Sequence, residues 1–275
     1  MRLLKKTLCL VMSGMIAVGF LDSCTSTGNN QNNGIDTVKV VNTAYDEAKM
    51  IFYSLPSPVE TIMILNNLGI RYNNEVLNPT SNVIKYTTQA SQALNLGIYS
   101  ADLSYCALYE QNPDAVKYLV PVKSLSEQLG IIGFFSDSII ERIQHNMDNK
   151  NKIVTIVSEA YTKSTSFLEE NSRNEIASMV IVGGWVEGLY ISTKMLLNLK
   201  DRDNEINDII TNQKFTLDDL IGLLNVFAND SSIQGLLEQM TDLKTVYDKV
   251  DISASPEILH ELDSKITSLR NKYIQ

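Results

Sequence analysis

The sequence IASMVIVGGWVEGLYIST, residues 176–193, contains one charged residue, Glu187. A helix that is apolar on all sides is buried, whereas a surface helix has a single apolar stripe. The stretch therefore predicts a buried, central helix. Its three glycines, Gly183, Gly184 and Gly188, each cost up to about 1 kcal/mol relative to alanine in a helix interior. We expect the backbone of another helix to lie close to them, because glycine permits such an approach.

A second stretch also lacks a polar face. ALNLGIYSADLSYCALY, residues 93–109, contains one charged residue, Asp102. Ala90, Gly97 and Ala101 form a strip of small residues on the same expected helix, and this strip is the counterpart of the glycines in the first stretch. We therefore expect the two helices to cross with their backbones close together, a crossing that can bring the two lone carboxylates near each other.

The remaining sequence is also helical in pattern. Apolar residues recur at three- and four-residue spacing in nearly every segment, and no alternating β-branched run bounded by turns is present. The predicted fold class is all-α, an irregular multi-helix bundle of about eleven helices with two buried central helices. An α-solenoid-like repeat is the alternative, but the period of about 34 residues that marks a tetratricopeptide array is absent. The expected helices are residues 37–54, 58–69, 81–111, 114–129 with a break near Pro121, 138–146, 150–170, 173–199, 203–212, 217–227, 231–250 and 256–273.

Capping patterns mark several expected helix starts. When glutamate follows serine by three residues, the serine hydroxyl accepts from the third amide of the helix and the glutamate reaches back. Serine followed by proline is a second start signal, because proline at the first helical position loses no hydrogen bond. The first pattern occurs at Ser57 with Glu60, Ser124 with Glu127, Ser138 with Glu141 and Ser172 with Glu175, with Thr216 and Asp219 as a related form, and the second at Pro58 and Pro256.

The N-terminus has the layout of a secretory signal peptide. Three basic residues precede an apolar run at residues 8–21. The run ends at Leu21-Asp22-Ser23-Cys24, which resembles a bacterial lipobox. Asp22 departs from that pattern and leaves open an ordinary secretory cleavage or an uncleaved anchor. We expect residues 1–23 to be a lipoprotein signal peptide and Cys24 to be lipidated.

The sequence after Cys24 predicts a tether and one folded domain. TSTGNNQNNG is polar and has no hydrophobic period, so residues 24–34 read as a lipidated cysteine with a flexible linker, and residues 35–275 as a single all-helical domain. Thr25 rather than aspartate follows Cys24, which resembles the sorting pattern for the outer membrane of a Gram-negative cell envelope. The protein could face either the periplasm or the cell surface. A membrane-spanning helix at residues 176–193 is disfavoured, because Glu187 lies well inside that run.

Charge and cysteine content exclude several partners. Removal of residues 1–23 takes three positive charges and one negative charge from 23 Lys+Arg and 32 Asp+Glu, which leaves 20 against 31 and a net charge of −11. This balance argues against nucleic acid as a partner and against docking on an anionic membrane by charge. Membrane attachment would therefore rest on the lipid. Cys106 is then the one cysteine of the folded domain, so no internal disulfide is expected.

Asp102 and Glu187 are the candidate functional residues. Burial raises the pKa of a carboxyl group, and a second carboxylate nearby raises the pKa of at least one of the two further. Such a pair suits acid–base chemistry or a ligand site. Tyr99, Trp185 and Tyr190 can add aromatic walls to such a pocket.

A structural interpretation of the same residues is preferred. Each carboxylate can be satisfied separately, by tyrosine hydroxyls or by a basic partner such as Arg71, Arg142 or Lys194, since buried polar groups normally find partners. The aromatic rings fall on helices whose composition already places them inside the core.

The sequence indicates no metal, cofactor or catalytic residue. Glu257 and His260 have the Glu-x-x-His spacing of di-iron bundles, but the motif occurs once and the chain has two histidines. Cys106 lies in a very apolar segment with no histidine near it in sequence, where a thiol is normally an inert hydrophobe.

Three motifs carry a family resemblance. LPSPVE at residues 55–60, GIYSADLSY at 97–105 and GGWVEGLY at 183–190 together resemble a family of all-helical bacterial lipoproteins with no assigned function, and they cover less than a tenth of the chain. The resemblance implies a lipidated helical protein and transfers no catalytic residue. We therefore predict a lipid-anchored envelope protein that acts as a binding or scaffolding module, with a protein partner. An envelope enzyme or small-ligand carrier that uses a buried pocket at Asp102 and Glu187 is the alternative.

Overall fold

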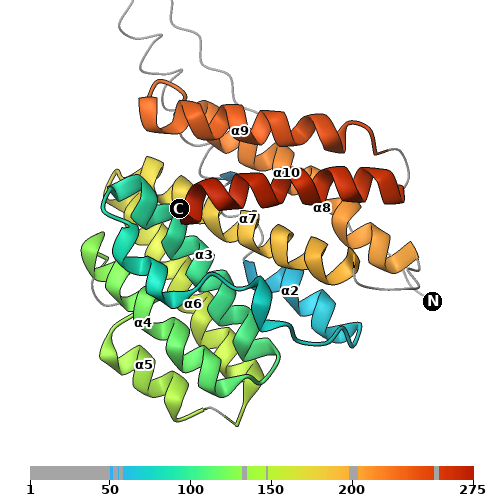
Figure 1. Cartoon of the computed structure of the whole chain (residues 1–275). Coiled ribbons are helices and arrows are strands. Elements are labelled where there is room, and N and C mark those ends of the chain that lie inside the picture. The colour runs from blue at the N-terminus through green and yellow to red at the C-terminus, as the bar shows by residue number, and fades with distance from the viewer. Residues whose placement is uncertain are drawn as a thin grey trace, which may run out of the picture. The chain divides into compact units, whose positions relative to one another are not determined.

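The all-α fold class is confirmed, since the described residues form α-helices and two short 3-10 helices and contain no strand (Figure 1). This computed structural model describes residues 50–51, 55, 58–131, 135–146, 148–197, 204–250 and 254–275. The segments expected to form a signal peptide and a tether, Cys24, and most of the helix expected at residues 37–54 lie outside the described residues. The elements are α2 (Pro58–Asn67), η1 (Asn74–Val76), η2 (Thr80–Lys85), α3 (Gln89–Leu108), α4 (Asn112–Gln128), α5 (Asp137–Gln144), α6 (Lys150–Glu170), α7 (Asn174–Leu197), α8 (Asn204–Val226), α9 (Ser231–Tyr247) and α10 (Pro256–Ile274).

The chain separates into two units, Met1–Val40 and Val41–Gln275, and every described residue belongs to the second. Within that unit the two apolar helices are central, as predicted. α7 packs against α2, α3, α6, α8 and α10, and α3 packs against α2, α4, α6, α7 and α10. All of residues 92–108 in α3 and 177–189 in α7 are buried. Among the described helices, α7 alone contains an 18-residue stretch that is apolar enough to cross a membrane. However, 89% of that stretch is buried inside the structure.

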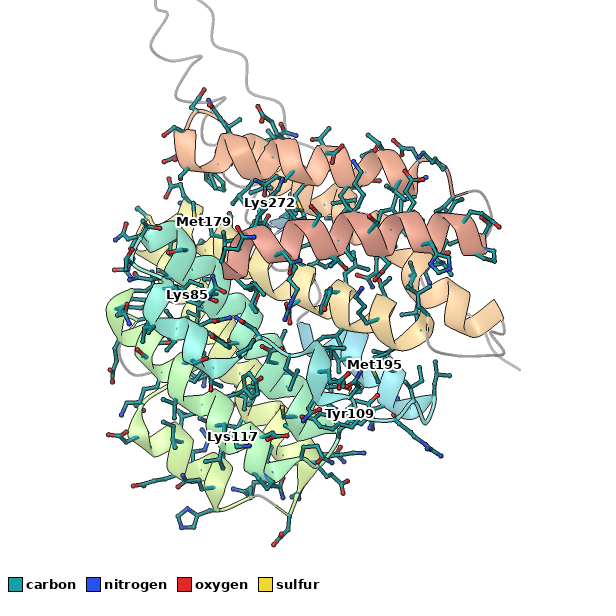
Figure 2. All side chains as sticks on the ribbon, viewed as in Figure 1. Lys85, Tyr109, Lys117, Met179, Met195 and Lys272 are labelled. Carbon is teal, nitrogen blue, oxygen red and sulfur yellow. The ribbon has the colours of Figure 1, made fainter. Side chains whose placement is uncertain are left out.

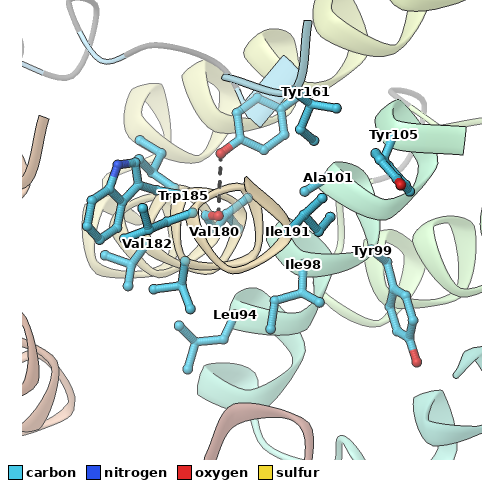
Figure 3. Packing of buried hydrophobic residues seen from close by; sticks show 14 of the residues in the cluster. Leu94, Ile98, Tyr99, Ala101, Tyr105, Tyr161, Val180, Val182, Trp185 and Ile191 are labelled. Carbon is cyan, nitrogen blue, oxygen red and sulfur yellow. Dashed lines mark hydrogen bonds between the residues drawn. The ribbon is translucent and has the colours of Figure 1, made fainter. Parts of the chain in front are cut away.

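The crossing of α3 and α7 is a backbone contact, as the glycines predicted. A Cβ atom on Gly97 would lie 2.0 Å from the carbonyl oxygen of Val180 and 2.5 Å from the amide nitrogen of Gly184. A Cβ atom on Gly183 would lie 2.0 Å from the carbonyl oxygen of Leu94. Real Cβ atoms do not approach backbone so closely, so neither position has room for a side chain. Figure 3 shows Leu94, Ile98 and Ala101 of α3 packed beside Val180 of α7.

The N-terminal end of α3 differs from the prediction. The helix expected from residue 81 begins instead at Gln89, and residues 80–85 form η2. Thr88 is the N-cap and forms a reciprocal capping box with Ser91, whose hydroxyl accepts from the Thr88 amide. Serine here takes the place of glutamate, so the Ser-x-x-Glu pattern does not find this start.

Two other predicted boundaries are wrong. α8 is one helix where residues 203–212 and 217–227 were expected to form two, and α4 continues through Pro121 without a break. Thr216 and Ser124 consequently lie inside helices rather than capping them. Packing explains both differences, because each helix buries one continuous apolar face across the expected break, with Ile210, Leu217, Leu220 and Leu224 in α8 and Tyr118, Val122 and Leu125 in α4.

The C-terminal helix starts where the serine–proline signal predicted. The Ser255 hydroxyl accepts from the Ile258 amide, and Pro256 occupies the first helical position of α10. α10 lies beside α9 and packs against α7 (Figure 1). Its buried stripe includes Leu262, Ile266 and an arginine, Arg270.

Figure 2 shows the side chains of the structure in the same view as Figure 1. Lys85, Lys117 and Lys272 are exposed, whereas Met179 and Met195 of α7 are buried. A segment of loop and 3-10 helix beside α3 buries a polar side chain as well as apolar ones. We call residues 70–86, which link α2 to α3 and contain η1 and η2, the strap. It buries Asn78 completely, together with Ile70, Val76, Leu77 and Tyr86.

Candidate functional site

Asp102 and Glu187 are buried together in the core. Each side chain is 0% exposed. The close crossing of α3 and α7 positions them, because Asp102 lies five residues after Gly97 and Glu187 four residues after Gly183. The negative charge of Glu187 acts directly on the carboxyl of Asp102. The two helices thus bring together the two carboxylates that stood out in the sequence.

Arg270 of α10 is the basic partner of Glu187. Its Nε donates to Oε2 of Glu187 at 2.6 Å and its Nη2 to Oε1 at 2.7 Å. This bidentate, charge-assisted geometry is the strongest form of an arginine–carboxylate pair. The same Nη2 also donates to the carbonyl oxygen of Val76 in the strap at 3.0 Å. The Tyr190 ring lies 4.2 Å from the guanidinium carbon, in cation–π contact.

The three basic residues suggested by the sequence do not have this role. Arg71 and Arg142 are exposed, and Lys194 pairs with Asp263 at 2.8 Å. Arg270 was missed, although it interrupts an apolar stripe that continues from Ile266 to Tyr273. A charged residue on an otherwise apolar helix face was the available signal.

The two oxygens of Asp102 have different surroundings. Oδ2 accepts from the backbone amide of Asn78 at 3.2 Å, whereas Oδ1 receives no hydrogen bond from a donor among the described residues. Burial raises the pKa of this carboxyl well above its usual range, and the charge of Glu187 raises it further, while Arg270 partly opposes both.

Asn78 links the strap to the core. Its Nδ2 donates to the Tyr86 hydroxyl at 3.1 Å, and its carbonyl oxygen accepts from the Tyr118 hydroxyl at 3.0 Å. The hydroxyl of Tyr99 donates to the carbonyl oxygen of Pro79 at 2.9 Å. The sequence did not indicate this network, because a buried asparagine in a loop has no periodicity to reveal it.

The three aromatic candidates occupy separate places. Tyr99 is fully buried and is directed to the strap through its hydroxyl bond. Trp185 is directed to α8, where its Nε1 donates to Oε1 of Gln213 at 2.9 Å. Figure 3 shows Trp185 and Tyr99 directed away from each other. Tyr190 contacts Arg270, the partner of Glu187.

Three hollows lined by described residues lie at the surface. The largest, of about 330 Å³, lies between α4 and α5 and includes Val116, Val120 and Ile140. Smaller ones of about 170 Å³ and 60 Å³ lie beside Phe135 and beside Gln239 respectively. Neither Asp102 nor Glu187 lines any of the three.

The described residues include no group of three or more His, Cys, Asp or Glu side chains able to hold a metal ion. Cys106 is buried, and burial raises the pKa of its thiol, with the Tyr72 hydroxyl 3.5 Å from its sulfur. The buried cluster can therefore hold charge and protons, while its thiol neighbour stays uncharged.

Comparison of the chain with protein-family models, with curated proteins and with solved structures finds no match.

Proposed function

We propose that this protein is a lipid-anchored component of a Gram-negative cell envelope, at the outer membrane, and that it acts there as a binding or scaffolding module for a protein partner. The observation that carries the proposal is Leu21-Asp22-Ser23-Cys24 directly after a basic segment and an apolar run. The polar residues that follow suit a tether. The resemblance of three motifs to helical bacterial lipoproteins supports the same interpretation.

The geometry around Asp102 favours a module over the alternative, an envelope enzyme or small-ligand carrier. Catalysis or ligand binding by a carboxylate needs access for a substrate or ligand. Both carboxylates are 0% exposed, and Glu187 uses both oxygens to bind Arg270. The three surface hollows lie elsewhere.

Lipidation is tested by replacing Cys24 in the full chain, expressed in a Gram-negative host. We expect Cys24→Ser to leave the membrane fraction after a high-salt and carbonate wash, and to lack acyl chains in mass spectra of its N-terminal peptide. Cys9→Ser is the matched control, because Cys9 lies within the signal peptide, and it should behave as wild type. Retention of Cys24→Ser as firm as that of wild type would contradict the anchoring.

The binding role is tested on the same cells by crosslinking. The wild-type protein should give a discrete adduct with an envelope protein, and the adduct should be lost when Cys24→Ser is released. Native mass spectrometry of purified wild-type protein distinguishes the alternative. A retained small molecule that Glu187→Gln loses would favour a ligand carrier.

A further inference from the structure

The buried cluster of Asp102, Glu187 and Arg270 has an unbalanced charge unless it holds a proton. With both carboxylates ionised its net charge is −1, and with one proton added it is zero. All three residues are at most 5% exposed. A buried charge without a partner is very costly, and such a group normally binds a proton instead. The neutral, protonated form is therefore favoured.

Two observations locate the proton on Oδ1 of Asp102. This oxygen accepts from no donor among the described residues, whereas Oδ2 accepts from the Asn78 amide. The close crossing of α3 and α7 holds Glu187 beside Asp102 in the core, and a hydrogen bond between the two carboxyls is one cause of the raised pKa of Asp102. Two ionised carboxylates are both acceptors, so such a contact is a bond only when one of them is protonated. Glu187 already accepts from Arg270, which leaves Asp102 as the donor.

We propose that this cluster is a proton-binding site, in which a proton on Asp102 Oδ1 is donated to Glu187 and keeps the strap closed over α3, α7 and α10. The strap forms hydrogen bonds with three elements around the site, α10, α3 and α4. Its Val76 carbonyl accepts from Arg270, its Asn78 amide donates to Asp102, and its Asn78 carbonyl accepts from Tyr118 of α4.

Loss of the proton loosens the strap for a physical reason. The ionised cluster carries a net negative charge away from water, and opening of the adjacent cover is the smallest movement that hydrates it. The strap is the cover with the least regular structure, two short 3-10 helices joined by loop, and such segments open at lower free energy than core helices. The site thus acts as a pH-sensitive closure.

The hydroxyl and thiol groups around Asp102 stay uncharged near neutral pH, so the Asp102 carboxyl is the group whose protonation changes. Burial raises the pKa of the hydroxyls facing it, Tyr86 of the strap, Tyr99 of α3 and Tyr118 of α4, and of the Cys106 thiol. Tyr161 of α6 is buried with its pKa raised in the same way. Burial lowers the pKa of Arg270, but the charge of Glu187, its hydrogen bonds to the guanidinium and the charge of Asp102 together raise that pKa above its usual value and keep Arg270 charged.

The sign of the pH dependence follows from the raised pKa of Asp102. The folded state binds the proton more tightly than the unfolded state, so stability falls as pH rises from the unfolded pKa, about 4, to the folded pKa. Across that window the folded-to-unfolded ratio falls about tenfold per pH unit from this site. In Asp102→Asn, which imitates the protonated form, this contribution should disappear. Asp242→Asn, at an exposed position, should keep it.

The first measurement uses the wild-type full chain in non-ionic detergent. Carbon-13 NMR of labelled aspartates should show one carboxyl, assigned to Asp102, that is still protonated at pH 7. In Glu187→Gln the same carboxyl should be ionised, because Asp102 then becomes the carboxylate nearest Arg270. An Asp102 carboxyl that is ionised at pH 7 in the wild-type protein would overturn the proposal, whether or not the variants fold.

Hydrogen exchange tests the strap separately. Opening of the Asn78 amide should increase with pH in wild type beyond the intrinsic increase in exchange rate. In Asp102→Asn only the intrinsic increase should remain. Amides of α9, far along the chain from the strap, provide the internal reference. Equal pH dependence of strap opening in wild type and Asp102→Asn would refute the link between proton and strap.

Discussion

The contribution of Arg270 to stability depends on its burial beside Glu187. The residue is 5% exposed, and its side chain binds both oxygens of Glu187. Formation of a buried ion pair gains little net stability, because both ions lose hydration. Removal of one member is much more costly, because the other remains buried and unpaired.

We therefore predict that Arg270→Met destabilises the protein by about 3–5 kcal/mol. Lys265→Met is the matched control, since Lys265 is on the same helix and pairs with Asp242 across an exposed surface. Its cost should be no more than about 1 kcal/mol. Urea denaturation of both variants in detergent measures the difference. Equal losses of stability would mean that burial of the Glu187 pair has no special energetic weight.

At the scale of elements, the contact between α3 and α7 determines the architecture. Their glycines allow backbone-to-backbone packing, and this contact places the carboxylates of two distant segments together. Interhelical distance depends on the side chains at the contact point. An added methyl group at the crossing must separate the two helices and disturb everything packed around them.

Gly97→Ala tests this contact. The new Cβ atom would lie 2.0 Å from the Val180 carbonyl oxygen, so we expect a loss of at least about 3 kcal/mol, the upper end for overpacking. Gly235→Ala in α9 is the control, because nothing lies within 4 Å of its Cβ position. Helix propensity alone should then stabilise that variant by up to about 1 kcal/mol. Thermal denaturation that shows both variants melting above wild type would exclude a tight crossing.

Helix boundaries were predictable where local signals and packing agree. α6 begins at Lys150 and ends at Glu170, as expected, and the Ser255 cap of α10 is confirmed. The boundaries failed at α3, α4 and α8. α3 starts at a capping box that has serine rather than glutamate at its third position. In α4 and α8 an apolar face continues past Pro121 and Thr216, and burial of that face outweighed the local signal for a break or a new start.

At the scale of the whole molecule, the C-terminal end of α10 closes the strap region. The last carbonyl groups of a helix lack partners within it. Here Asn95 of α3 donates to the carbonyl oxygen of Tyr273 at 2.8 Å, and the Tyr86 hydroxyl donates to that of Ile274 at 3.4 Å. Asn95 also accepts from Asn78 at 3.5 Å. Segments at opposite ends of the domain are thus joined through buried side chains.

Asn95→Leu should cost about 1–3 kcal/mol, because it removes the side-chain donor to the Tyr273 carbonyl oxygen and one acceptor of the Asn78 amide in the core. It should also speed hydrogen exchange in the strap. Asn171→Leu is the matched control, since Asn171 makes a similar bond to the Phe167 carbonyl oxygen at an exposed helix end. Its effect should stay within about 0.5 kcal/mol. If strap exchange is unchanged in Asn95→Leu, the C-terminal end of α10 does not hold the strap.

The sequence by itself determined the all-α class, the two central helices and their glycine crossing. These properties depend on the polarity and size of residues within one helix, which periodicity records. It also singled out Asp102 and Glu187, because a lone charge in an apolar run is visible locally. Only the tertiary structure decided that Arg270 neutralises Glu187 and that Asn78 faces Asp102. Arg270 and Glu187 are 83 positions apart in the sequence, and Asn78 and Asp102 are 24 positions apart. Which residues become partners over such separations depends on how all the helices pack together.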